Sequence, residues 1–327
     1  MRFPSSLAGE SNHEKCSRSS VPKSASVNTE RPERRLGRLG AYLALTKPRV
    51  MELLLLTTAP TMVLAEGGLP NLGAVGATLV GGAASSGAAA VFNMYFDRDV
   101  DAQMARTSGR PIVTGEVSPR AALTFAWSLA AFATAWFALL VNPLAAALST
   151  IAIIWYVVIY TLVLKRRTIQ NIVWGGLAGC FPVLIAWASA TGTVTWSAGL
   201  LFLVVFFWTP AHYWPLSVRY GDDYRRAGIP MLGAVRPPSE VAASVLRYAI
   251  ATSICALALI SLAGVGIIYS TTAALAGAWF VWHAWRYLTA TRSATPDRAR
   301  PMKVFVASNA YLAVLFIAVA VDTFVTH

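Results

Sequence analysis

The sequence predicts an all-α integral membrane protein with nine transmembrane helices. Of its 327 residues, 56% are hydrophobic and only 13% are charged, which leaves too little polar surface for a soluble globule of this size. Apolar segments recur along the chain, each long enough or nearly long enough to cross a bilayer core about 30 Å thick. The basic residues also gather on one side of these segments.

The first 46 residues contrast with the rest of the chain. They are rich in Ser, Arg, Glu and Pro and contain no long apolar run, which predicts a disordered cytoplasmic tail over 1–46. Acidic residues in this tail disfavour a mitochondrial transit peptide, and the apolar core of a secretory signal is missing. The transmembrane domain is expected over 47–327.

The apolar segments are expected at approximately 50–65, 73–95, 120–140, 144–164, 170–190, 198–218, 241–263, 269–290 and 303–324. The second segment contains a run of Gly, Ala and Ser. Such a run is typical of a helix that packs closely against its neighbours.

The loops predict the orientation in the membrane. All 27 Lys and Arg fall in the tail, in the connections after segments two, four, six and eight, or close to those ends. The positive-inside rule therefore places the N-terminus and these connections in the cytoplasm, and nine segments place the C-terminus outside. The acids in the tail favour a bacterial plasma membrane over a mitochondrial one.

The formal net charge of +12 could suggest a nucleic-acid partner. The basic residues are scattered between apolar runs, however, so we expect no nucleic-acid binding. The cysteines, at Cys16, Cys180 and Cys255, are odd in number and far apart. That spacing indicates neither a disulfide framework nor a zinc cluster.

One polar stretch directly follows the second segment. Asn93, Asp97 and Asp101 recur every four residues, so on a helix these oxygen ligands share one face. Arg106 and Arg110 follow closely, which brings metal-binding oxygens and anion-binding guanidiniums together. The pattern favours a magnesium-bound phosphate, whereas the alternative is a solvated acidic loop. Asp99 points away from this face.

Two further polar stretches leave the membrane on the same side. Lys165 begins a basic run after segment four, and Asp222 and Asp223 follow segment six. Carboxylates held close together repel one another, and a divalent cation relieves that repulsion. Lys165 is the basic residue nearest the membrane, so we expect it to face the anion, although such residues also serve as topology signals.

His212 lies in an aromatic run within or just above segment six. A histidine at membrane depth is costly unless it lines a cavity or has a partner. Pro210 and Pro215 interrupt the helix, and flanking rings such as Trp208 offer a flat apolar surface that suits a planar macrocycle. The alternative is a kinked interfacial helix. His283 has no acidic neighbour in sequence and is expected to be structural.

These stretches resemble the UbiA superfamily of intramembrane prenyltransferases. Its Asn-x-x-x-Asp-x-x-x-Asp motif matches Asn93, Asp97 and Asp101, and the extended stretch to Pro111 is more specific. Within the superfamily the chain is similar to the haem branch, as seen in 160–168, 171–176, 208–214 and 223–232. The similarity begins at about Leu45 and covers the rest of the chain.

Two departures from the family pattern affect the expected site. Ala227 stands where a second Asp-x-x-x-Asp motif would place an acid, which leaves Asp222 as a substitute beside Asp223. Ala211 replaces a proline commonly found before the histidine, but His212 itself is retained.

The resemblance implies a UbiA-type bundle with a central cavity capped by the two acidic loops. It implies transfer of the farnesyl group of farnesyl diphosphate to a vinyl group of haem b, with addition of water, giving haem O. The implied Mg²⁺ ligands are Asn93, Asp97, Asp101, Asp222 and Asp223, with Asp97, Asp101 and Asp223 as catalytic candidates. The diphosphate would be held by Lys47, Arg106, Arg110 and Lys165, and the haem by His212 and Trp208.

Two other functions compete with this one. A prenyltransferase could instead act on an aromatic quinone precursor, although the aromatic run around His212 argues against that acceptor. A haem-binding or transport protein without chemistry would be expected to carry its charges near the membrane midplane. The expected partners are membrane lipid and, from the pathway, a haem A synthase or an oxidase assembly factor.

Overall fold

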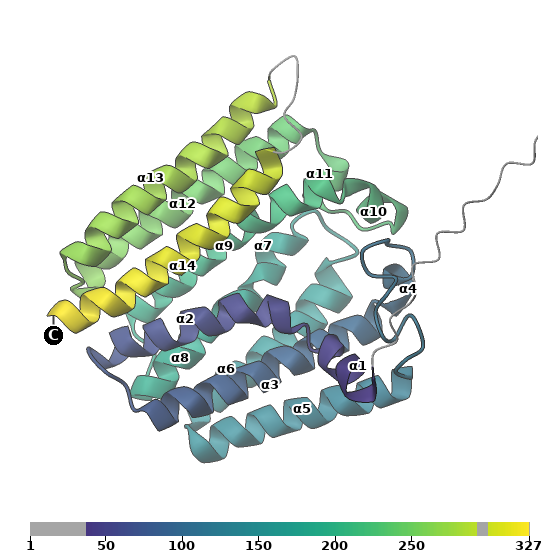
Figure 1. Ribbon diagram of the computed structural model, residues 1–327, viewed down its shortest axis with the longest axis horizontal. Helices are drawn as coiled ribbons and strands as arrows, with labels where there is room; N and C mark the ends of the chain where they lie inside the picture. Colours follow the sequence, from purple (N-terminus) through teal and green to yellow (C-terminus); the bar gives the residue numbers. More distant parts are fainter. Residues whose placement is uncertain (1–36, 293–299, 327) are drawn as a thin grey trace, which may run out of the picture. The chain divides into compact units, whose positions relative to one another are not determined.

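The computed structural model describes residues 37–292 and 300–326, in which every regular element is a helix (Figure 1). The elements are α1 (Arg38–Leu45), α2 (Pro48–Glu66), α3 (Leu72–Phe96), α4 (Arg98–Asp101), α5 (Pro119–Leu140), α6 (Pro143–Ile154), the π-helix η1 (Trp155–Leu164), α7 (Asn171–Gly175), the 3₁₀-helix η2 (Gly176–Cys180), α8 (Phe181–Thr191), α9 (Trp196–Arg219), α10 (Gly221–Arg226), α11 (Leu232–Val235), α12 (Pro238–Ala263), α13 (Ile267–Ala290) and α14 (Arg300–Thr326).

Each predicted apolar segment coincides with one long helix or with a run of consecutive helices. Within the described part, seven spans are long and apolar enough to cross a membrane: Leu72–Phe96, Pro119–Leu140, Pro143–Leu164, Asn171–Thr191, Trp196–Arg219, Pro238–Ala263 and Arg300–Thr326. The remaining two, α2 and α13, are less apolar because α2 contains Arg49 and Glu52, whereas α13 contains His283 and Arg286. The fold class is therefore confirmed, but the count of nine spans is not.

The predicted disordered tail ends too late in the chain. Residues 1–36 lie outside the described part, so disorder there stays a prediction. Helix α1, in contrast, is regular, and the prediction of disorder is wrong for this helix. Its Ala41 and Leu45 are buried in a core cluster with Ala88 and Val91 of α3, and this burial offsets the entropy of ordering so short a helix.

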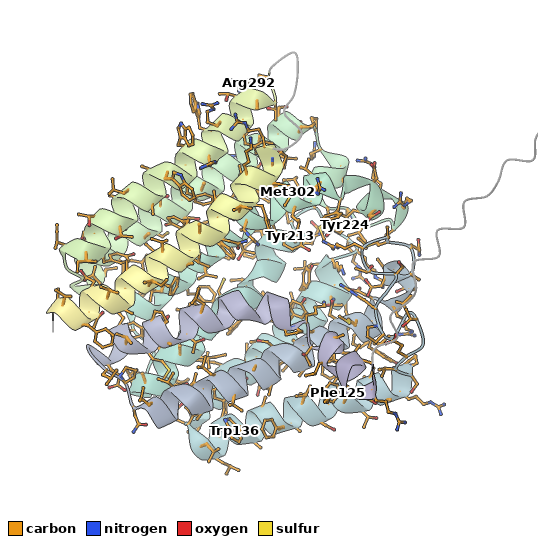
Figure 2. The ribbon with its side chains drawn as sticks, viewed as in Figure 1. Phe125, Trp136, Tyr213, Tyr224, Arg292 and Met302 are labelled. Carbon is orange, nitrogen blue, oxygen red and sulfur yellow. The ribbon has the colours of Figure 1, made fainter. Side chains whose placement is uncertain are left out.

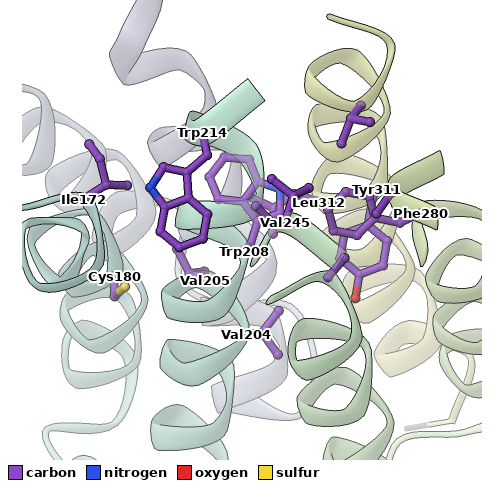
Figure 3. Packing of buried hydrophobic residues seen from close by; sticks show 14 of the residues in the cluster. Ile172, Cys180, Val204, Val205, Trp208, Trp214, Val245, Phe280, Tyr311 and Leu312 are labelled. Carbon is purple, nitrogen blue, oxygen red and sulfur yellow. The ribbon is translucent and has the colours of Figure 1, made fainter. Parts of the chain in front are cut away.

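The long helices form two packed groups (Figure 1). In one group α12 lies against α9 and α13, and α14 lies against α13, α9 and α2. Its core contains large rings, among them Trp208, Trp214, Phe280 and Tyr311 (Figure 3). In the other group α3 packs along α5, and α6 lies against α5 and α8.

The run of small residues in α3 produces the close packing that the sequence predicts. A Cβ atom on Gly81 would lie 2.7 Å from the ring of Phe137 in α5, so the two helices can approach this closely only without a side chain there. The indole of Trp136, also in α5, donates to the carbonyl of Ala77 at 2.8 Å. This contact joins α5 to α3 one turn away.

Candidate active site

The first acidic motif lies where α3 passes into α4. The backbone N–H of Asp97 donates to the carbonyl of Asn93 at 2.9 Å, and that of Asp101 donates to the carbonyl of Asp97 at 2.7 Å. The four-residue register therefore continues across the helix break, and the three polar side chains stay on one face, as predicted. All three residues are buried, with exposed fractions of 3% for Asn93, 0% for Asp97 and 2% for Asp101.

Cations from three segments of the chain meet this face. Lys165, after η1, forms an ion pair with Asp97, and Arg110 forms one with Asp101. Lys47, just before α2, donates from Nζ to Oδ1 of Asn93 at 2.8 Å. Buried carboxylates need such partners, so the structure brings together six predicted residues, which we call the cage: Lys47, Asn93, Asp97, Asp101, Arg110 and Lys165.

Lys47 occupies an unusual position in this cage. Its backbone has a φ of 54°, in the left-handed region that residues other than glycine rarely adopt. Burial, with Arg110 and Lys165 close by, lowers the pKa of its ammonium group well below the ordinary value. The Lys47 ammonium group is therefore held in a position where an anion would stabilise its charge.

Asp99 and Arg166 form the rim of the cage. The Arg166 guanidinium donates to both carboxylate oxygens of Asp99, at 2.7 and 2.8 Å, and to the carbonyl of Phe96 at 3.0 Å. These hydrogen bonds lower the pKa of Asp99. The Asp99 side chain is 58% exposed, which confirms that it points away from the buried face.

Thr161 is a cage contact that the sequence reasoning did not assign. Nδ2 of Asn93 donates to Oδ2 of Asp97 at 2.6 Å and to Oγ1 of Thr161 at 3.1 Å. Thr161 belongs to η1, where Lys165 donates from its backbone to the carbonyl of Tyr160 five residues earlier. In a π-helix residues about five apart share a face, which turns Thr161 toward the cage. An apolar run carries no signature of a π-helical turn, so no local pattern pointed to Thr161.

The cage residues fit a magnesium ion that is shared with a substrate phosphate. Oδ1 of Asp97 is buried and has no hydrogen-bond partner among the described residues; the Arg166 guanidinium lies 3.6 Å from it. Within the described residues no group of three or more His, Cys, Asp or Glu could hold a metal by itself. Mg²⁺ usually takes only one or two carboxylates and completes its shell with water and substrate phosphates, and Asp97 and Asp101 supply that number.

The aspartates of the second acidic loop form local ion pairs, which the sequence reasoning did not predict. Asp222 pairs with Arg225 and Asp223 pairs with Arg226, each three residues along the same short helix, α10. The Asp222 side chain is 83% exposed, so its predicted role as a metal ligand is not supported. Asp223 is mostly buried, but its carboxylate is engaged by a local arginine. Neither carboxylate forms an ion pair with a cage residue within the described chain.

Arg106 contacts the second loop, and its predicted role as a diphosphate ligand stays a prediction. Its guanidinium donates to the hydroxyl of Tyr224 at 3.0 Å and lies over the ring of Tyr220, 4.9 Å from the centroid. Tyr224 in turn lies 3.3 Å, oxygen to oxygen, from Tyr213 of α9 (Figure 2). Met104 packs in the same buried cluster as Tyr224. Arg106 therefore ties the first loop to the second, instead of joining the cations of the cage.

The aromatic run in α9 is tightly packed. The imidazole of His212 is stacked between Trp208, at 4.3 Å, and Phe305, at 4.5 Å between centroids. Its Nδ1 lies 2.8 Å from the hydroxyl of Ser308, and the Trp208 indole donates to the carbonyl of the same residue at 2.7 Å. Trp208 is buried and covered by His212, so the prediction that its face receives a macrocycle is not supported. His212 keeps only its Nε2 edge for another partner.

An apolar cavity leads away from the cage between α2, α3, α6 and α8. Lys47 and Tyr156 line its cage end. The unfilled space is about 850 Å³ when the open solvent at its mouth is included. Helix α3 lines it with small residues: Thr78, Gly82, Ser85, Ser86, Ala89 and Ala90. The other walls include Thr58, Ala152, Ile153, Ala178, Gly179, Pro182 and Ile185.

Solved structures with the same arrangement of helices exist. A structure described as digeranylgeranylglyceryl phosphate synthase matches with a TM-score of 0.72 at 14% identity, covering 88% of this chain and 99% of the other. A UbiA homologue from Archaeoglobus fulgidus, bound to DMAPP and Mg²⁺, matches with a TM-score of 0.61 at 19% identity, covering 86% and 99%. At these identities the likeness shows the fold alone.

Comparison of sequences identifies the family. Two curated relatives are both named protoheme IX farnesyltransferase. The protein from Pseudarthrobacter chlorophenolicus is 58% identical, covering 87% of this chain and 89% of the relative, and the one from Tropheryma whipplei is 52% identical, covering 88% and 95%. The model of the UbiA prenyltransferase family matches residues 54–309. The chain therefore belongs to the UbiA prenyltransferase family.

Proposed function

We propose that this protein transfers the farnesyl group of farnesyl diphosphate to a vinyl group of haem b and, with addition of water, forms haem O. The observation that carries the proposal is the buried cage at the mouth of an apolar cavity, which offers one site for a diphosphate and one for a prenyl chain. Relatives named protoheme IX farnesyltransferase, more than half identical, support the choice of donor and acceptor.

The proposed membrane arrangement has nine spans, with α2 and α13 added to the seven that are long and apolar enough. Both helices pack along α14, which is one of those seven. The distribution of Lys and Arg supports a cytoplasmic N-terminus and cytoplasmic acidic loops. The farnesyl chain then enters the cavity from the cage side, with its diphosphate held at the cytoplasmic end.

Three residues are proposed to hold Mg²⁺ together with the diphosphate: Asn93, Asp97 and Asp101. When bound, Mg²⁺ would neutralise charge on the departing diphosphate. Lys165 and Arg110 already touch the two carboxylates, so both can turn to the diphosphate oxygens when the carboxylates receive another cation. The cage is preorganised and buried, and in such a site its charges act more strongly than they would in water.

The reaction makes one carbon–carbon bond and one carbon–oxygen bond. The bond between C1 of the farnesyl chain and the diphosphate oxygen breaks, and the electron pair leaves with the diphosphate. The terminal vinyl carbon of the haem bonds to C1. The cation left beside the macrocycle takes up water, which then loses a proton. The burial of Asn93, Asp97 and Asp101 keeps bulk water from C1 before the vinyl group reacts.

Three of the predicted roles are narrowed in this proposal. Asp223 is retained as the residue of the second loop that can approach the diphosphate, because it is mostly buried, whereas Asp222 is not. His212 is still proposed to contact the haem, through its Nε2 atom. Trp208 is proposed only to pack against His212. Arg106 is assigned to holding the two loops together through Tyr224.

The test uses the purified protein in lipid nanodiscs with farnesyl diphosphate, haem b and Mg²⁺, followed by mass spectrometry of the extracted haem. Formation of haem O that depends on Mg²⁺ supports the proposal. Asp97→Asn should abolish it, whereas the matched control Asp99→Asn, at the exposed rim, should not. Prenylation of 4-hydroxybenzoate without prenylation of haem b would show that the acceptor is wrong, and haem binding without product would show a non-catalytic haem protein.

A further inference from the structure

The α3 wall of the apolar cavity has a regular spacing. Its lining residues fall near positions 78, 82, 85–86 and 89–90, every three or four residues, and so form one helical face. All of these side chains are small. On other faces of the same helix Gly81 contacts Phe137, and Val80 is 46% exposed. The small residues on the cavity side of α3 therefore leave space in the cavity, whereas Gly81 allows α3 to pack closely against α5.

The cavity has a polar head at Lys47 and an apolar tail. At the head Lys47 contacts Asn93 at 2.8 Å. At the tail Ile185 belongs to a buried cluster with Phe137 and Ala145. On the wall formed by η2, a Cβ atom added to Gly179 would meet no atom within 4 Å. A chain entering at the head therefore runs past small side chains along α3 toward the buried cluster that contains Ile185.

The length of this wall can be compared with that of a prenyl chain. At 1.5 Å per residue, Ser86, Gly82 and Thr78 lie about 10, 16 and 22 Å along α3 from Asn93. An extended carbon chain advances about 1.25 Å per bond, so the main chains of geranyl, farnesyl and geranylgeranyl groups are about 9, 14 and 19 Å long. The three chain ends therefore fall near Ser86, near Gly82, and between Gly82 and Thr78.

We propose that this face of α3 sets the longest prenyl chain that the protein accepts, with side-chain size at Ser86, Gly82 and Thr78 acting as three successive stops. The absence of a side chain at Gly82 admits the last isoprene unit of farnesyl diphosphate. A larger residue there would occupy the same space, and a close-packed interior does not yield enough to hold both. The inference rests on the proposed function, because it assigns the cavity to the prenyl chain of the donor.

The experiment measures binding of unreactive thiolodiphosphate analogues of ten, fifteen and twenty carbons, with Mg²⁺, to the full-length protein in detergent. Gly82→Leu should weaken binding of the fifteen- and twenty-carbon analogues at least about tenfold and leave the ten-carbon analogue within about twofold. Ser86→Leu should weaken all three, and Thr78→Leu only the longest. Val80→Leu, on an exposed face of α3, is the matched control and should change none.

Binding of the ten-carbon analogue also shows whether the Gly82→Leu variant is folded, because the folded variant should still bind this analogue. If that variant does not fold, Gly82→Ala and Gly82→Val replace it and should lower the ratio of fifteen- to ten-carbon affinity in that order. Equal weakening of all analogues by folded Gly82 variants, or no weakening, would overturn the proposal. Tight binding by the unaltered protein without formation of haem O would refute the proposed function and leave the chain-length inference intact.

Discussion

The two acidic loops both carry aspartates and arginines, but they arrange them in different structures. In the first, Asp97 and Asp101 are buried, and their cations, Lys165 and Arg110, come from outside the helical face that carries the acids. In the second, Asp222 and Asp223 each pair with an arginine three residues along α10. A carboxylate whose cation comes from a distant segment depends on the whole fold, whereas a local pair forms within one turn of helix.

This difference indicates that the first loop forms a binding site, whereas the Asp222 end of the second loop is ordinary protein surface. In the part of the chain that the structure describes, one buried carboxylate oxygen of Asp97 in the first loop has no hydrogen-bond partner, which is costly unless a cation uses it. In the second loop the ion pair of Asp222 is mostly exposed, and pairs of that kind contribute little free energy. We therefore expect substitutions in the first loop to lower activity much more than substitutions in the second loop.

The largest effect is expected for Asp97→Asn. The change keeps the shape of the side chain but removes the charge that Lys165 and the proposed magnesium ion share, so kcat should fall about 10³-fold. The rate of haem O formation in nanodiscs gives this value, and a thermal melt checks that the variant folds. Retention of more than a tenth of the activity would show that the buried carboxylate is not part of the chemistry.

The next effect is expected for Lys165→Met. Removing the ammonium group leaves Asp97 with Arg166, 3.6 Å away, as its nearest cation, and removes a proposed ligand of the diphosphate. We expect kcat/KM for farnesyl diphosphate to fall about 10²-fold, mainly through KM. Lys165→Arg is the matched control, because it keeps the charge and should restore part of the loss. An unchanged KM would place Lys165 in a purely structural role.

A smaller effect is expected for Asp223→Asn. The Asp223 carboxylate is mostly buried but is engaged by Arg226, so it can assist the diphosphate only after that pair opens. Removing a group that contacts the reacting charge directly costs about 10²–10³-fold in kcat. Asp223 is only partly available, so we expect kcat to fall about tenfold for Asp223→Asn. Arg226→Gln should lower kcat less. A loss as large as that of Asp97→Asn would show that the second loop joins the cage during the reaction.

The sequence alone supports the first loop better than the second because its signal is local. The four-residue interval of Asn93, Asp97 and Asp101 needs only a helix to bring the oxygens together, and the structure has that helix register. The contacts of Arg106, in contrast, could not be predicted from the sequence. After Asp101 the chain leaves the helix, so sequence distance no longer tells which loop a guanidinium reaches, and here it reaches Tyr224.

Other parts of the site could not be predicted because they depend on contacts between distant helices. The π-helical turn that directs Thr161 toward Asn93 has no signature in an apolar run, since α and π hydrogen bonding suit the same residues. The stacking of His212 between Trp208 and Phe305 requires α14 to lie beside α9. The run of small residues in α3 predicts close packing, but not which of its faces would line a cavity.

The smallest effect is expected for Asp222→Asn. Its side chain is 83% exposed, and within residues 37–292 and 300–326 its ion pair is with Arg225, which also donates to the carbonyl of Ala234 at 2.9 Å. Arg225 therefore keeps a partner when Asp222 is neutralised, and an exposed ion pair contributes at most about 1 kcal/mol. Activity should stay within about twofold of the unaltered protein and the melting temperature within a few degrees. A loss of activity of tenfold or more, with the fold intact, would mean that Asp222 moves from solvent to contact the diphosphate. The difference between the two loops would then hold only for the protein without its substrate.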